Sequence, residues 1–201
     1  MSSPPKDTRT RILAAAWALL EKGDGRGVRM SDIAKAAGVS RQALYLHFPT
    51  RGELLVETTR YLDVVKNVDD GLIASRTAAS GRERLDAFIE AWGNYIPEIY
   101  AGAKALLAMQ DTDEAAALAW ADRMRALRHG CAAAVDALAH DGVLRQDQSA
   151  EHATDILFTL VSVRNWETLT RDCGWSQQRY VDTTKQLARR VLVADSASPA
   201  A

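Results

Sequence analysis

Residues 32–48 are the most informative segment of the chain; they read Asp32-Ile-Ala-Lys-Ala-Ala-Gly-Val-Ser-Arg-Gln-Ala-Leu-Tyr-Leu-His-Phe48. Apolar residues recur at helical spacing on both sides of Gly38, which predicts two short helices, over residues 30–37 and 41–48. Glycine tolerates the positive backbone dihedral of a tight turn, and Ser40 is a residue type that caps a helix N-terminus. Two short helices joined by such a turn form a helix-turn-helix.

The second of these helices carries side chains that suit the base edges of double-stranded DNA. Leu44 and Phe48 are four residues apart and share its inner face, which leaves the other positions pointing outward or sideways. Gln42 can form a bidentate pair with adenine, and Arg41 can pair with guanine or grip a phosphate. The methyl group of Ala43 can touch a thymine methyl. This face is therefore predicted to read sequence in a major groove.

Neighbouring polar side chains suit the DNA backbone. Tyr45 and His47 can hydrogen-bond phosphates, which fixes the register without reading sequence. Arg51 adds positive charge at the start of the following helix. Without the flanking apolar pattern, an ordinary solvated helix face would explain the following side chains equally well: Arg41, Gln42, Tyr45 and His47. The complete set that we predict to contact DNA is Ser40, Arg41, Gln42, Ala43, Tyr45, His47 and Arg51.

The segment Ile33-Ala-Lys-Ala-Ala-Gly-Val-Ser-Arg-Gln-Ala-Leu-Tyr-Leu-His-Phe-Pro-Thr-Arg-Gly-Glu-Leu-Leu55 resembles the signature of the TetR (tetracycline repressor) family of bacterial transcriptional regulators. The resemblance is specific over about residues 8–60 and architectural beyond them. It implies a homodimer that binds an operator and is most often a repressor released by a small-molecule effector. The chain departs from the family pattern in two places: Arg29 stands where the family usually has a capping Thr, and Gly25 roughly where it has an aromatic residue.

The remaining sequence predicts an all-α, nine-helix TetR-like architecture, because helical apolar patterns alternate with Gly, Pro, Ser and Asp breaks and strand patterns are nearly lacking. We expect a helix-turn-helix DNA-binding domain over residues 1–50, an effector-binding and dimerisation domain over 51–195, and a disordered tail over 196–201. The expected helices are residues 8–22, 30–37, 41–48, 51–75, 80–95, 97–109, 111–140, 149–170 and 176–193.

Bulky side chains of the second domain have two interpretations. Core packing is favoured for each of them alone, whereas the family resemblance implies an effector pocket among Trp92, Tyr95, Tyr100, Met109, Trp120, Met124, Phe158 and Trp166. The apolar stripes of the last two helices equally suit the protein's own core. The resemblance implies a four-helix dimer interface there, with Ile156, Leu160, Val161, Tyr180, Leu187 and Val191. A dimer is also expected physically, because two recognition helices spaced by one helical turn read a symmetric site.

Composition and charge narrow the class of protein further. Of 201 residues, 25 are Lys or Arg and 26 are Asp or Glu, yet residues 1–60 carry 10 basic against 6 acidic residues. Residues 1–60 are therefore basic while the rest of the chain is acidic, which suggests that residues 1–60 bind a polyanion. No apolar run approaches the roughly 18 residues of a membrane-spanning helix. The two cysteines form neither a metal-spaced cluster nor a disulfide framework, so a reduced cytoplasmic setting is expected.

Catalytic motifs are not found in the sequence. It contains no nucleophile elbow, phosphate-binding loop or dinucleotide fingerprint, and its four histidines are scattered. His129 and Cys131 lie two residues apart, so they face different sides of a helix and predict no metal site. We therefore expect no enzyme, no cofactor and no membrane association. A helical protein-docking module without DNA binding is the main alternative, and a small all-α enzyme is a weaker one.

Overall fold

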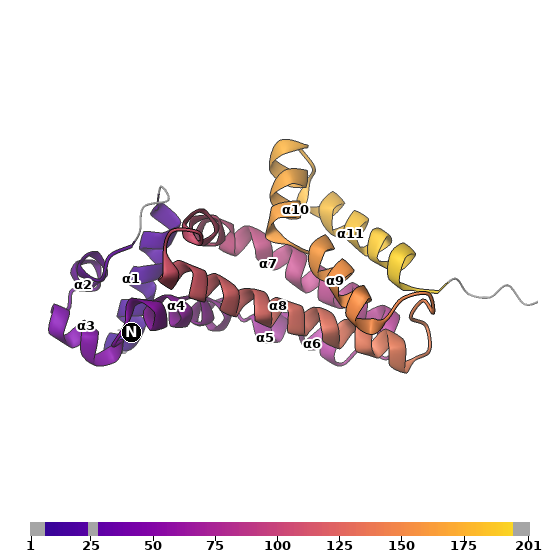
Figure 1. Cartoon of the computed structure of the whole chain (residues 1–201), viewed down its shortest axis with the longest axis horizontal. Coiled ribbons are helices and arrows are strands. Elements are labelled where there is room, and N and C mark those ends of the chain that lie inside the picture. Colours follow the sequence, from indigo (N-terminus) through magenta and orange to yellow (C-terminus); the bar gives the residue numbers. More distant parts are fainter. Residues whose placement is uncertain (1–6, 24–27, 195–201) are drawn as a thin grey trace, which may run out of the picture. The chain divides into compact units, whose positions relative to one another are not determined.

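The computed structural model describes residues 7–23 and 28–194, and over these ranges it confirms an all-α fold (Figure 1). These residues form eleven α-helical segments and one π-helical turn, close to the nine helices expected. The segments are α1 (Thr8–Lys22), α2 (Met30–Ala37), α3 (Arg41–His47), α4 (Arg51–Val65), α5 (Val68–Gly71), α6 (Ile73–Arg76), α7 (Gly81–Met109), α8 (Glu114–His140), α9 (Ala150–Leu160), α10 (Val163–Glu167), η1 (Thr168–Asp172) and α11 (Gln177–Leu192). The predicted tail and Gly25 lie outside the described residues.

The chain divides into two compact units. The first unit consists of Met1–Asn67 and Ile99–Met124, and the second of Val68–Glu98 and Arg125–Ala201. The long helices α7 and α8 therefore contribute residues to both units. The functional division at residue 50 stays a prediction. No helix in the described ranges is long and apolar enough to span a membrane.

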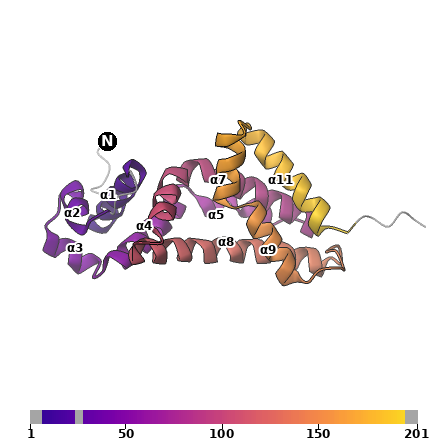
Figure 2. The same cartoon turned by 45° about the horizontal axis from the view of Figure 1, so that its top comes forward.

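Helices α1 to α3 form where the sequence predicts them. The bounds of α1 and α2 agree with the expected ranges, and α3 ends one residue earlier, at His47. The side chain of Arg29 makes no capping hydrogen bond at the start of α2, as expected for arginine in that place. The three helices lie together at one end of the first unit in both views (Figures 1 and 2).

Two helices predicted as continuous are broken, and each break has a local cause. The helix expected over residues 51–75 ends at Val65, because Asn67 adopts a left-handed backbone conformation with φ of 51°, and the short helices α5 and α6 follow. The helix expected over residues 149–170 breaks after Leu160. There, the Ser162 hydroxyl accepts a hydrogen bond from the Asn165 amide (3.2 Å) and starts α10 as a new helix.

A predicted break at Pro97 is wrong: α7 runs through this residue as one helix of 29 residues. Proline has no N–H, so the carbonyl oxygen of Gly93, four residues earlier, loses its helical donor. In the second unit, the side-chain amide of Gln177 donates a hydrogen bond to this oxygen at 2.8 Å. The Trp166 indole N–H in turn donates to the Gln177 side-chain oxygen, also at 2.8 Å. A distant side chain thus replaces the hydrogen bond that Pro97 removes.

The second unit is held by close helix packing. At Gly81, an added Cβ would lie 2.6 Å from the backbone carbonyl carbon and oxygen of Ala137 on α8, so only glycine allows this approach. Helices α9 and α11 lie side by side in both views (Figures 1 and 2). Ion pairs Arg189–Asp86 and Lys185–Glu90 connect α11 to α7.

Candidate nucleic-acid interface

The turn between α2 and α3 has the geometry that the sequence predicts. Gly38 ends α2 in the left-handed conformation, with φ of 65° and ψ of 37°. The Ser40 hydroxyl accepts a hydrogen bond from the backbone amide of Ala43 at 3.0 Å and so caps α3. Because nearby residues supply both the turn conformation and the capping hydrogen bond, the start of α3 has a defined position relative to α2.

The inner faces of α2 and α3 are buried against α1. Leu44 has no exposed surface and Phe48 is 1% exposed. They belong to one apolar core that also contains Ile12, Leu13, Ala16 and Leu20 of α1 and Met30, Ile33, Ala34 and Ala37 of α2. This core fixes the inner face of α3 against α1 and α2 and leaves its opposite side for solvent or a partner.

The outer face of α3 carries the side chains predicted to read DNA bases. Arg41 and Gln42 are exposed, Tyr45 is 43% exposed, and Ala43 is half-buried. Leu46 is not among the residues predicted to contact DNA, yet it is 79% exposed. Its position was nevertheless readable, because it lies two residues after the buried Leu44, about 200° around the helix axis.

His47 is half-buried rather than fully outward, and α1 supports this end of α3. Nη1 of Arg9 donates a hydrogen bond to the His47 carbonyl oxygen at 3.2 Å. The same guanidinium stacks over the Phe48 ring at 4.4 Å and pairs with Glu57 at 3.3 Å. Arg9 is therefore engaged within the first unit, where it joins α1, α3 and α4.

Arg51, predicted to contact phosphate, is engaged within the first unit as well. Its Nε donates to the Val28 carbonyl oxygen at 2.5 Å, and its Nη1 lies 2.6 and 2.8 Å from the two carboxylate oxygens of Asp113. The hydrogen bond from Arg51 lowers the pKa of Asp113, partly offset by burial. Arg51 thus fixes the start of α4 to the segment before α8, and a phosphate would share the guanidinium with Asp113.

Further ion pairs follow α4 along α8. Arg60 donates two hydrogen bonds to Asp122, at 2.7 and 3.2 Å, and Arg123 pairs with Asp63. The hydrogen bond from Arg60 is the main reason that the pKa of Asp122 is lowered, against an opposing effect of burial. Because α4 directly follows the helix-turn-helix, these pairs secure the helix that carries it.

The eight residues predicted to line an effector pocket are divided between the units. Tyr100, Met109, Trp120 and Met124 lie in the first unit, and Trp92, Tyr95, Phe158 and Trp166 in the second. Met109 is buried in the apolar core of the first unit, and Trp120 packs against it. In the second unit, the Trp92 indole N–H donates to the Val161 carbonyl oxygen at 2.7 Å, and the Trp92 and Tyr95 rings meet edge to face at 5.8 Å.

The residues predicted for a dimer interface differ in how far they are buried. Val161 and Tyr180 are each 1% exposed inside the second unit, and burial raises the pKa of the Tyr180 hydroxyl to about 12. Leu187 and Val191, one helical turn apart on α11, are 40% and 39% exposed. Ile156 and Leu160 on α9 are half-buried.

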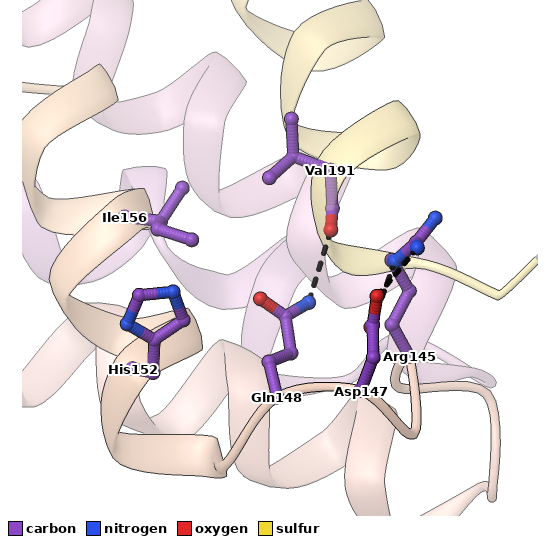
Figure 3. Close-up of a pocket in the computed structure, with 6 residues that line it drawn as sticks. All are labelled: Arg145, Asp147, Gln148, His152, Ile156 and Val191. Atoms are coloured by element: carbon purple, nitrogen blue, oxygen red, sulfur yellow. Dashed lines mark hydrogen bonds and ion pairs between the residues drawn. The ribbon is translucent and has the colours of Figure 1, made fainter.

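Beside this exposed surface lies a recess of about 300 Å³ (Figure 3). Ile156 and Val191 line it together with Arg145, Asp147, Gln148 and His152. The Gln148 side-chain amide donates to the Val191 carbonyl oxygen at 2.9 Å, and Arg145 pairs with Asp147 at 2.7 Å. The recess thus borders the surface predicted for dimerisation, and its lining includes none of the eight predicted effector residues.

Comparisons with known proteins agree with this geometry. The family model described as "Bacterial regulatory proteins, tetR family" matches residues 12–58, which include α2 and α3. The chain is 43% identical over 56 residues to the HTH-type transcriptional regulator CymR from Pseudomonas putida, a match that covers 28% of each chain. Some curated relatives are similar to this chain only in this region, and the chain spans about a third or less of their length.

Two further similarities extend over most of the chain. The HTH-type transcriptional activator FasR from Mycolicibacterium smegmatis is 28% identical over 192 residues, which cover 92% of this chain and 83% of FasR. A putative transcriptional regulator from Saccharomonospora viridis, solved in complex with choline, has the same fold with a TM-score of 0.70. That structure is 24% identical, and the match covers 93% of this chain and 98% of the other. These findings point to a transcriptional regulator rather than an enzyme, and residues 12–58 form a domain of the tetR family of bacterial regulatory proteins.

Proposed function

We propose that this chain is a homodimeric, sequence-specific DNA-binding regulator that acts as a repressor and is released from its operator by a small molecule. The observation that carries the proposal is the exposed face of α3. Arg41 and Gln42 are presented to solvent on a helix whose start is capped by Ser40 and whose opposite side is buried. An α-helix fits the major groove, where Gln pairs with adenine and Arg with guanine.

The proposed functions are assigned to consecutive parts of the chain. Residues 1–50 bind DNA, residues 51–195 bind the effector and dimerise, and residues 196–201 form a tail. Tyr45 and the half-buried His47 contact phosphates beside the base-reading residues Gln42 and Ala43. Arg51 contributes its charge while it remains paired with Asp113. Such a regulator acts where bacterial DNA is, in the cytoplasm.

The proposed dimer interface uses the exposed surface of α9 and α11. Leu187 and Val191 supply its apolar centre, Ile156 and Leu160 flank them, and Val161 and Tyr180 support the helices from beneath. Leu187→Asp is expected to shift the protein from dimer to monomer in sedimentation velocity, because it places a charge in the apolar centre. Val64→Asp, at an exposed apolar site on α4, is the matched control and is expected to leave the dimer intact. A dimer that survives Leu187→Asp would contradict this interface.

The proposed effector is a small molecule bound among the aromatic side chains, of which Trp92, Tyr95, Phe158 and Trp166 belong to the second unit. Support comes from the family resemblance and from the choline complex of a protein with the same fold. Choline is therefore the first compound to test, by its effect on tryptophan fluorescence and on DNA binding. Release of DNA supports a repressor, whereas tighter DNA binding in its presence would contradict release by this compound.

Selection from a random pool of double-stranded DNA tests the central proposal. The full-length protein is expected to enrich a sequence with two symmetric halves, since a symmetric dimer presents two copies of α3. Gln42→Ala is expected to weaken binding to that sequence by about 1–3 kcal/mol and to relax the preference at one position in each half. Gln178→Ala, an exposed glutamine on α11 that is bonded to Asp182, is the control. Equal losses on every sequence would contradict base reading by Gln42.

A further inference from the structure

A single apolar side chain stands at the centre of the outer face of α3. Leu46 has the largest exposed fraction of any large apolar residue in the described ranges. It lies two residues after Leu44 and two before Phe48, both of which are buried. Because two residues turn a helix by about 200°, Leu46 points directly away from the core on which α3 rests.

The neighbours of Leu46 determine what it meets. Gln42 lies four residues before it and Ala43 three, so all three side chains share one strip of helix surface. When Gln42 approaches an adenine edge in the major groove, Leu46 is carried into the same groove. The apolar group that bases present there is the C5-methyl group of thymine. Covering the leucine with that methyl removes apolar surface from water on both sides.

We infer that Leu46 is a specificity-determining residue that contacts a thymine C5-methyl group beside the base read by Gln42. The inference rests on the proposed DNA-binding function and adds a preference that hydrogen bonding does not supply. A regulator that used only Arg41 and Gln42 would read donor and acceptor patterns. With Leu46, the same helix also distinguishes thymine from bases that lack the methyl group.

Uracil substitution tests this contact one thymine at a time, since uracil differs from thymine only by the missing C5-methyl group. The probe is the DNA sequence that wild-type protein selects from a random pool, synthesised with each thymine replaced singly by uracil. At the position that Leu46 contacts in each half-site, wild-type protein is expected to lose about fourfold in affinity, the value of one buried methyl group. Leu46→Ala is expected to bind the thymine and uracil probes at that position equally.

Two controls make the comparison specific. Leu118→Ala, at another exposed leucine in the first unit, is expected to keep the wild-type discrimination between thymine and uracil. Circular dichroism of Leu46→Ala is expected to match wild type, because alanine favours helix and the side chain has little contact to lose. A loss of thermal stability in this variant would place Leu46 in the core and overturn the inference.

The outcomes distinguish a failure of the Leu46 contact from a failure of the proposed DNA-binding function. If wild-type protein selects a sequence but tolerates uracil at every thymine, the thymine contact is wrong and DNA binding stands. If Leu46→Ala loses affinity equally on thymine and uracil probes, the leucine touches the DNA backbone or sugars, which also overturns base reading. If wild-type protein selects no sequence at all, the proposed function fails and this inference fails with it.

Discussion

The helix-turn-helix and the second unit are both helical, yet residues close in sequence set the helix boundaries in the first, whereas a contact between distant parts of the chain keeps a helix continuous in the second. In the helix-turn-helix, Gly38 turns the chain and Ser40 caps α3 through the amide three residues on. In the second unit, α7 continues through Pro97 because Gln177, 84 residues from Gly93, replaces the missing donor. The boundaries of α2 and α3 therefore follow from nearby residues, whereas the continuity of α7 depends on a side chain far away in the sequence.

The largest effect is expected from Gly81→Ala in the second unit. The new Cβ would meet the α8 backbone at Ala137, which cannot move aside as a flexible side chain can. We expect a loss of about 3 kcal/mol in the free energy of unfolding, measured by urea titration at fixed protein concentration. Gly71→Ala, where no atom lies within 4 Å, is the control and is expected to cost little. Equal stability of both variants would mean that α7 and α8 do not approach this closely.

Gln177→Leu is expected to cost about 2 kcal/mol in the same assay. It removes the hydrogen bond to the Gly93 carbonyl oxygen and the acceptor that Gln177 offers to Trp166. Hydrogen exchange of the α7 amides around Pro97 is expected to accelerate. Gln178→Leu, next along the chain and exposed, is the matched control. Unchanged exchange at α7 in Gln177→Leu would show that the helix continues through Pro97 without this support.

Acid is expected to weaken the Arg51–Asp113 pair of the first unit. The pKa of Asp113 is lowered in the folded protein, so the ionised pair stabilises the fold above the unfolded-state pKa of about 3.9. This contribution is lost as the pH falls through the lower folded-state value. The Asp113 side chain also accepts a hydrogen bond from the Ala116 amide at 3.1 Å, at the start of α8. Asp113→Asn keeps an acceptor for this amide but no charge, and is expected to be less stable than wild type by about 1–2 kcal/mol at pH 7. The two proteins should converge at low pH; a constant difference down to pH 2 would contradict an ionic contribution.

Ser40→Ala is expected to have the smallest effect, about 1 kcal/mol, because it removes one capping hydrogen bond at the start of α3. Ser176→Ala removes the equivalent cap of α11, where the Arg179 amide is the donor, and should cost about as much. Thermal unfolding followed by circular dichroism compares the two variants. A much larger loss in Ser40→Ala would show that the helix-turn-helix depends on more than this local capping bond.

Sequence alone predicted those elements whose causes lie within a few residues. The bounds of α1 and α2, the turn at Gly38 and the cap at Ser40 all follow from residue types at fixed spacing. The continuity of α7 was not predictable, because it depends on Gln177. The end of α4 depends on Asn67 adopting a left-handed conformation, which asparagine tolerates but does not require.

The candidate site shows the same distinction. The outward positions of Arg41 and Gln42 followed from the inward positions of Leu44 and Phe48, and Leu46 could have been placed by the same argument. The internal partners of Arg51 could not, because Asp113 is 62 residues away in the sequence. The burial of Tyr180 and Val161 likewise depends on how the helices of the second unit pack.

The central claim is that this chain binds a particular DNA sequence through base contacts from α3, and does not bind through phosphate contacts alone. Its most direct test is fluorescence anisotropy of the full-length protein on its selected DNA sequence and on a shuffled copy of the same length, at two salt concentrations. We predict that binding to the selected sequence persists at the higher salt while binding to the shuffled copy is lost, because phosphate contacts alone weaken steeply with salt. Equal binding to both sequences that disappears at higher salt, or no binding at either concentration, would contradict the claim.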